Sequence, residues 1–256
     1  MKTPAAFLGH GNPMNALEHN RYTDAWRSFA SAAETPRAIL MVSAHWYVNL
    51  TAVTAMAKPR TIHDFYGFPQ RLFDVEYPAP GSPEIAAEIV ETLSPLYCGL
   101  DADSWGIDHG AWSLLVHLYP AADIPVLQLS IDATKSIDQH LELGRALAPL
   151  RDQGIMVIAS GNVVHNLGMI DWGAQGKGAP WAHEFDDQVR QIMTTAPGEL
   201  ARAETFGAYG LAVPTPDHFL PLAYLAGMAE AEGATCRTLL AGCELGSLSM
   251  TSFVLD

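Results

Sequence analysis

Short apolar runs that alternate with longer amphipathic segments are the feature that most restricts how this chain can fold. Strands are predicted at Ala5–Leu8, Arg37–Ser43, Thr51–Met56, Pro125–Ser130, Ile155–Ala159 and Leu248–Leu255. Helices are predicted at Met14–Ala32, Pro83–Leu93, Ala111–Leu118, Ser136–Asp152, Trp181–Thr194 and His218–Glu230. Strands separated by helices form βαβ units. The pattern therefore predicts an α/β protein with a mainly parallel central sheet flanked by helices.

Composition limits the domain organisation and the classes of partner. No repeat, low-complexity tract or long linker interrupts the 256 residues, so we expect a single domain over 1–256. Hydrophobic residues make up 49% and charged residues 16%, which excludes intrinsic disorder. A net charge of −14 argues against binding to nucleic acid or to an anionic membrane. Cysteines without paired spacing, and no signal-like or membrane-spanning apolar stretch, lead us to expect a cytoplasmic protein.

The placement of the histidines is the main functional signal. His10, His45 and His165 lie at or just after the carboxyl ends of predicted strands, next to Gly, Ser or Asn. In open α/β sheets, ligand sites form at that edge. His218 opens a helix after a Pro-rich loop, and His109 lies just ahead of another helix. This coincidence favours one metal site assembled from distant segments, with positions left open for substrate.

Other interpretations of these residues remain open. Each histidine taken alone is an ordinary polar residue at a strand end or helix start, and His63 lies in a loop that either binds substrate or forms a buried aromatic turn. Asp108 and Asp217 either orient a neighbouring histidine or cap a helix. Imidazole ligands alone do not choose among Zn, Fe, Cu and Ni. Four further histidines lie within helical patterns and are assigned a structural role: His19, His117, His140 and His183.

Nucleophilic and phosphate-binding sites are less well supported. Ser43 and Ser160 follow apolar runs, but neither lies in a G-x-S-x-G elbow. The motif GHGNP lacks the G-x-G-x-x-G spacing of a dinucleotide site, and there is no Walker A lysine. A cofactor bound through phosphate is therefore not expected.

Seven motifs, in order along the chain, resemble those of the 4,5-DOPA dioxygenase extradiol family, which belongs to the class III (LigB-type) extradiol dioxygenases. They are GHGNP, SAHW, HDFYGFP, YPAPG, DHGAW, SGNVVHNL and PTPDHFLPL, and they run from Gly9 to Leu222. The resemblance implies a single α/β domain in which non-haem Fe(II) binds a catechol and O2 and the ring opens beside the diol. It also implies that Zn(II) can occupy the site in purified protein.

The resemblance also implies roles for individual residues. His10, His45 and His218 match metal ligands, where the wider class often has a carboxylate as the third. His165 matches the acid/base and is a possible fourth ligand, and His109 matches a residue near the open coordination position.

Three functions follow as hypotheses. The first is an extradiol dioxygenase acting on a DOPA-like or related catechol, and the second is a zinc hydrolase that uses the same histidines with a bound water. The third, a binding or scaffold protein on the same fold, fits the histidine set least well. Trp46, Phe65 and Tyr66, with Phe68, are candidates for a flat slot around the substrate ring, although core packing explains each aromatic side chain equally well. Two arginines beside the aromatic loop are the candidates for binding a substrate carboxylate: Arg60 and Arg71.

Overall fold

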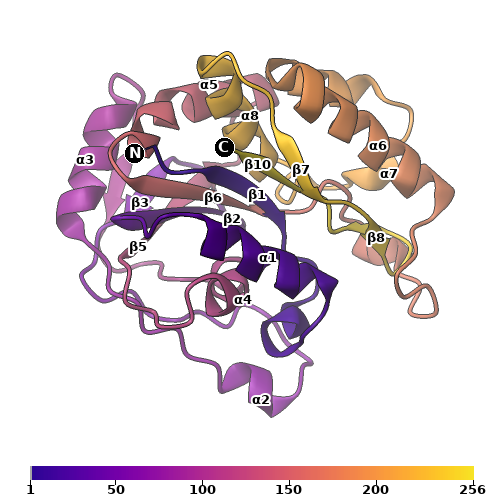
Figure 1. Ribbon diagram of the computed structural model, residues 1–256, viewed down its shortest axis with the longest axis horizontal. Helices are drawn as coiled ribbons and strands as arrows, with labels where there is room; N and C mark the ends of the chain where they lie inside the picture. The colour runs from indigo at the N-terminus through magenta and orange to yellow at the C-terminus, as the bar shows by residue number, and fades with distance from the viewer. Residues whose placement is uncertain (1) are drawn as a thin grey trace.

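The computed structural model describes residues 2–256, and one mixed sheet runs through the middle of the molecule (Figure 1). Its strand order is β4 (Gly99–Asp101), β3 (Ala52–Thr54), β5 (Val126–Asp132), β2 (Ala38–Val48), β6 (Ile155–Gly161), β1 (Ala5–Gly9), β10 (Ser252–Leu255) and β7 (Arg237–Leu240). The central strands β5, β2, β6 and β1 are parallel, whereas β3, β10 and β7 each pair antiparallel with a neighbour. The predicted α/β fold with a mainly parallel sheet is confirmed.

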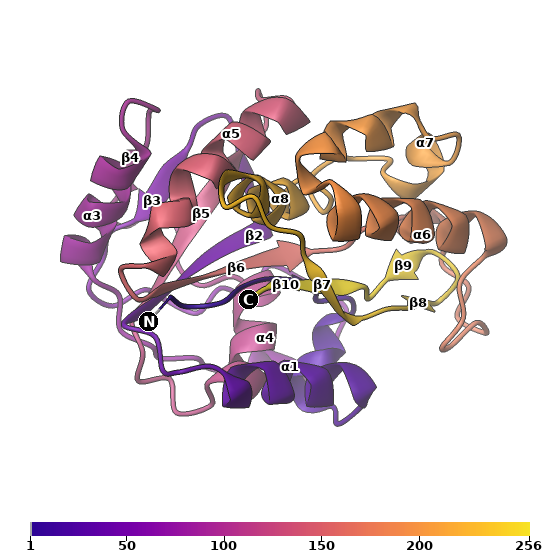
Figure 2. The ribbon, with the colours of Figure 1, turned by 45° about the horizontal axis from the view of Figure 1, so that its top comes forward.

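Helices cover both faces of the sheet (Figure 2). One face carries α3 (Pro83–Leu93), α5 (Ile137–Leu147), α6 (Pro180–Thr195) and α8 (Pro221–Ala231), and the other carries α1 (Arg21–Ala32) and α4 (His109–Leu118). The shorter elements are α2 (Gln70–Phe73), α7 (Tyr209–Ala212), the 3₁₀ helices η1 (Pro13–Leu17), η2 (Ala148–Arg151), η3 (Leu167–Met169) and η4 (Pro197–Thr205), and the two-stranded ribbon of β8 (Cys243–Glu244) and β9 (Leu248–Ser249). Among the residues described, no helix is both long and apolar enough to cross a bilayer.

The central strands are apolar on both sides because each side is covered. Successive side chains of a strand point to opposite faces. Phe7 therefore packs in the core beneath α5 and α8, whereas Leu8 packs with Trp26 of α1 and Trp112 of α4. This double burial explains why β1 and β6 appear in the sequence as continuous apolar runs.

Several predicted boundaries were wrong, and local hydrogen bonds explain the differences. The predicted helix Met14–Ala32 is broken because the Asn20 side chain accepts from the backbone of Tyr22 and Thr23 and starts α1 anew. The predicted strand Leu248–Leu255 divides, since β9 pairs with β8 and β10 pairs with β1. Helix α8 begins at Pro221, so His218 lies in the turn before it.

The fold brings several loops to one edge of the sheet. Strands β1, β2 and β6 are parallel, so the segments that follow them leave on the same side. Strand β2 extends to Val48, five residues beyond its predicted end, and its pairing with β5 becomes irregular between Val42 and Tyr47. His45 lies in this irregular segment. The amino ends of α4 and α8 lie at the same edge, which is where ligand sites form in open α/β sheets.

Candidate metal centre

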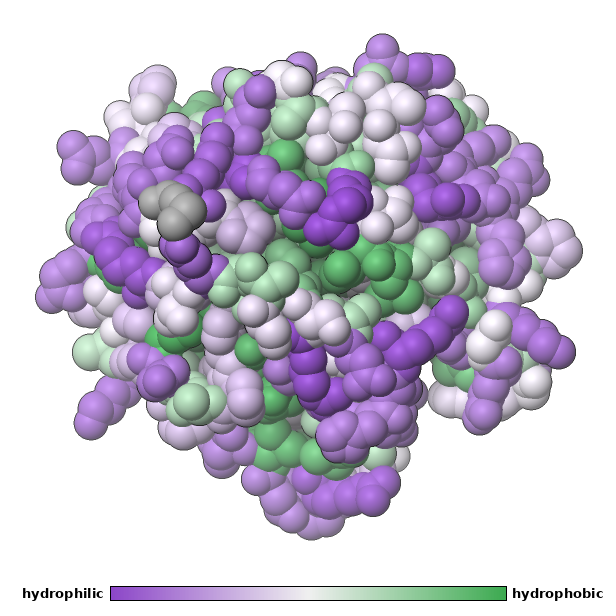
Figure 3. Space-filling view, viewed as in Figure 1, coloured by the Kyte–Doolittle hydropathy of each residue, from purple (hydrophilic) through white to green (hydrophobic). Residues whose placement is uncertain are grey.

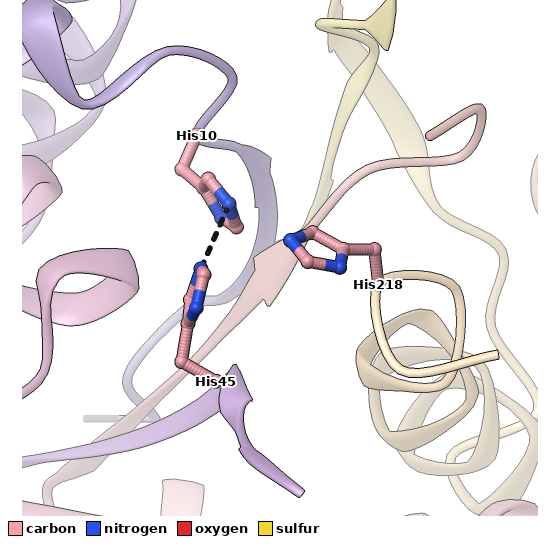
Figure 4. Close-up of side chains that lie close together, drawn as sticks. All are labelled: His10, His45 and His218. Carbon is pink, nitrogen blue, oxygen red and sulfur yellow. Dashed lines mark hydrogen bonds between the residues drawn. The ribbon is translucent and has the colours of Figure 1, made fainter. Parts of the chain in front are cut away.

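Three histidines from distant parts of the chain converge at this edge (Figure 4). His10 follows β1, His45 lies in β2, and His218 precedes α8. One ring nitrogen from each of the three lies within 4.8 Å of the others, and the Nε2 atoms of His10 and His45 are 3.4 Å apart. Bonds of about 2.0–2.1 Å to a tetrahedral metal ion place neighbouring nitrogens roughly 3.4 Å apart. The donor set and its spacing fit a divalent transition metal ion.

Each of these histidines has an acceptor beside its Nδ1 atom. The Ser160 hydroxyl donates to the Gly110 carbonyl, so it accepts from Nδ1 of His10 at 2.9 Å. Nδ1 of His45 lies 3.1 Å from Asp64 Oδ2, and Nδ1 of His218 is hydrogen-bonded to Asp217. An imidazole that donates through Nδ1 keeps its Nε2 lone pair free for a metal ion. The two open interpretations of Asp217 are thereby resolved, because its carboxylate orients His218.

Two further histidines border the trio without belonging to it. The ring of His165 stacks on that of His218, with centroids 3.5 Å apart and an interplanar angle of 4°. The ring of His109 lies 3.9 Å from that of His45. Among residues 2–256, His165 is not one of the three whose nitrogens meet within 4.8 Å, so the structure places it beside His218 and outside the trio.

A buried carboxylate fixes helix α4 against the site. Asp108 caps α4 by accepting from the backbone of Ala111, and it also accepts from the Ser43 hydroxyl at 2.7 Å and from Gln128. Asp108 therefore acts as a helix cap, the second of its two predicted roles. At Gly110 a Cβ atom would lie 2.6 Å from His45 Cδ2, so the close approach of α4 to His45 requires glycine.

Burial keeps most of these imidazoles neutral. Burial is the main cause that lowers the pKa of His10, and the neighbouring imidazoles lower it further. The same two causes lower the pKa of His165 to about 2. Burial also lowers the pKa of His218 to about 4, although Asp217 opposes this shift. For His45, burial is outweighed by the hydrogen bond to Asp64 and by nearby carboxylates, so its pKa is raised. Neutral imidazole is the form that binds metal.

The histidines form the floor of a cavity of about 510 Å³. Phe65 packs edge-on against His109 with ring centroids 5.4 Å apart, and Phe68 packs against Phe65. Tyr66 lies at the rim and is 92% exposed. Further residues that were not predicted from the sequence also line the cavity: Leu167, Ile170, Trp172, Leu245 and Leu248.

Several residues that were candidates for binding the substrate do not line this cavity. Trp46 is buried and stacks on Trp105 with centroids 5.7 Å apart, and it is not among the residues that line the cavity. Because Trp46 follows His45 on a strand, its side chain points to the opposite side. Neither Arg60, which donates to the Ser104 carbonyl, nor Arg71 lines the cavity. His63 lies within 2.8 Å of the Val75 carbonyl and packs inside its loop.

Asp64 is the charged residue of the site that was not predicted from the sequence. It lies between His63 and Phe65 in the motif HDFYGFP, where attention fell on the histidine and the aromatic residues. Its carboxylate contacts both His45 and His109. A single acidic residue inside an aromatic loop beside a motif histidine was the available signal.

Comparison with known proteins identifies the family. Residues 5–253 match the model for the catalytic LigB subunit of aromatic ring-opening dioxygenase. The chain belongs to the LigB family. A relative from Escherichia coli (strain K12), named 4,5-DOPA dioxygenase extradiol, is 48% identical over 98% of this chain and 94% of its own length. A relative of the same name from Beta vulgaris is 38% identical over 87% of this chain and 85% of its own.

Solved structures agree with this family membership. The crystal structure of an uncharacterized protein from Escherichia coli K12 matches with a TM-score of 0.86 and 43% identity, over the whole of both chains. The predicted resemblance to LigB-type extradiol dioxygenases is confirmed, as is the prediction that the protein is an extradiol ring-opening enzyme.

Proposed function

We propose that this LigB-family protein opens the ring of a catechol that carries a DOPA-like or related side chain, with Fe(II) held by His10, His45 and His218. One observation carries the proposal. Three imidazoles whose Nδ1 atoms lie beside acceptors present their free nitrogens together, at the floor of a cavity with an aromatic wall. Fe(II) bound there would promote ionisation of the diol and bring it together with O2.

The side chains around the trio supply proton transfer. His165 lies against His218 and lines the cavity, so its position makes it our candidate for accepting a proton from a catechol hydroxyl and returning it later. His109 lines the same cavity next to His45, and we assign it a supporting role beside the open coordination position.

The cavity walls orient the substrate. Phe65 and Phe68 offer ring faces and edges to a flat aromatic molecule, and Tyr66 reaches solvent at the rim. In this arrangement the catechol ring lies among the aromatic side chains and its substituent extends toward the rim. Trp46 is buried against Trp105 and is not one of the aromatic side chains that we propose contact the substrate.

Reconstitution of the metal-free protein tests the proposal. The protein is loaded anaerobically with Fe(II) or with Zn(II), and O2 consumption and a yellow ring-opened product are followed with DOPA and a small panel of catechols. We expect uptake with Fe(II) and none with Zn(II). Stoichiometric metal without O2 uptake for any catechol would contradict the proposal and favour the alternative, a zinc hydrolase that uses the same three histidines.

A further inference from the structure

We propose that Asp64 is a positioning residue that serves two histidines at once, one through each carboxylate oxygen. Oδ2 lies 3.1 Å from Nδ1 of the ligand His45, and Oδ1 lies 2.9 Å from Nδ1 of His109. This inference rests on the proposed function for the role of His45 as a ligand. The contacts of Asp64 are independent of that function.

The backbone holds the carboxylate in this bridging position. Asp64 Oδ1 also accepts a hydrogen bond of 2.9 Å from the backbone N–H of His109, the first residue of α4. The next residue of the loop, Phe65, packs edge-on against the His109 ring and lines the cavity. One loop segment therefore provides both the aromatic wall for a substrate and the carboxylate behind the metal ligand.

The chemistry of a carboxylate dictates which nitrogen each ring presents. An ionised carboxylate only accepts hydrogen bonds, so a ring nitrogen held about 3 Å from it is favoured in its N–H form. When the rings are neutral, Asp64 thereby favours the Nδ1–H form of His45 and of His109, and Nε2 carries no proton in either ring. For His45 that atom lies 3.4 Å from Nε2 of His10, within the trio. For His109 it is a hydrogen-bond acceptor next to the catalytic cavity.

An isosteric substitution separates this role from simple packing. In Asp64→Asn one oxygen becomes an NH2 group, so the side chain can accept from one ring only and opposes the N–H of the other. Asp74→Asn is the matched control. Asp74 directly follows α2, ten residues beyond Asp64; it is exposed, and its carboxylate accepts a hydrogen bond from the Gln70 side chain.

The first readout is the tautomer of each histidine in the metal-free protein, from two-bond ¹H–¹⁵N correlation spectra. With the spectra recorded at a pH high enough to deprotonate His45, whose pKa is raised, we expect the neutral Nδ1–H form for both His45 and His109 in the wild-type protein and loss of that form for at least one of them in Asp64→Asn. A neutral Nε2–H tautomer of either ring in the wild type, with Nδ1 unprotonated, would overturn the proposal, and this result does not depend on the variant folding.

The second readout is affinity for Co(II), measured by its visible absorption. Loss of a partner behind a metal ligand typically costs about 10–100-fold in affinity. We expect a loss of this size in Asp64→Asn, a fall in kcat larger than any change in KM, and wild-type values in Asp74→Asn. Affinity within twofold of wild type in Asp64→Asn would refute the positioning role. If Co(II) affinity falls but the wild-type enzyme consumes no O2, the positioning role stands and the proposed function fails.

Discussion

One cavity lies at each end of the parallel strands, and the two differ more in the side chains that line them than in volume. The larger, of about 710 Å³, lies at the amino end, where apolar side chains gather between β7 and α1 (Figure 3). Its cations are each paired with a carboxylate, as Lys2 is with Glu232 at 2.9 Å and Arg237 with Asp256 at 3.0 Å. The smaller, at the carboxyl end, holds five histidines.

The difference shows what makes a site in this fold. The cavity at the amino end, between β7 and α1, requires only that the side chains of a strand and a helix leave a gap between them. At the carboxyl end, the chain leaves β1, β2 and β6 in one direction and places side chains from distant segments around one point.

Removing a central ligand should destroy the carboxyl-end site. His45→Ala takes away one of three converging nitrogens and leaves Asp64 without one of its partners. We expect metal content and O2 consumption to be lost together, with the fold retained by circular dichroism. Metal analysis after dialysis checks this, and normal metal binding by the variant would refute the ligand assignment.

Removing the neighbouring imidazole should separate turnover from metal binding. His165→Ala leaves the trio of His10, His45 and His218 in place. General acid–base catalysis contributes about 10²–10⁴-fold, so we expect kcat to fall by at least about 100-fold while most of the metal remains bound. Full activity of this variant on its substrate would exclude an acid/base role for His165.

A buried histidine outside the cavity should affect stability alone. His140 is fully buried, with Nδ1 3.0 Å from the Tyr224 hydroxyl, and burial lowers its pKa to about 4. A histidine whose folded-state pKa lies below its unfolded value of about 6.5 keeps its full contribution above that value and loses it as pH falls toward 4. The loss is on the order of 3 kcal/mol at most.

Urea unfolding of wild-type protein and His140→Gln between pH 7 and pH 4 measures this loss. We expect a shallower decline in the free energy of unfolding for the variant and unchanged kcat at pH 7. Parallel declines in the two proteins would show that His140 is not responsible.

A substitution in the cavity at the amino end should have the smallest effect on stability and activity. Arg237 and Asp256 form an exposed ion pair, a type that typically contributes about 0–1 kcal/mol. Arg237→Ala should therefore shift the melting temperature by a few degrees or less and leave kcat/KM unchanged. A several-fold change in kcat/KM would mean that the two ends of the sheet communicate, which the contrast between them does not predict.

The sequence predicted most of the parallel sheet and brought attention to the histidines at its edge. Strand ends and helix starts follow from apolar periodicity, and parallel strands send their following segments to one side, so the convergence of His10 and His45 was predictable. The position of Asp64 depends on the path of an irregular loop, which periodicity does not describe. The prediction that Trp46 faces the substrate was wrong for a simpler reason. Strand β2 continues through His45, so the adjacent side chain points away.

Isotope labelling tests the central claim most directly. The Fe(II)-loaded protein is supplied with a catechol that it consumes under ¹⁸O₂, and the product is analysed by mass spectrometry. We expect a ring-opened product that contains both oxygen atoms of one O2 molecule, with ¹⁸O retained in its new carboxylate and exchange with water confined to its aldehyde. A product that gains oxygen only from water would refute ring-opening by O2 and identify the histidine site as hydrolytic.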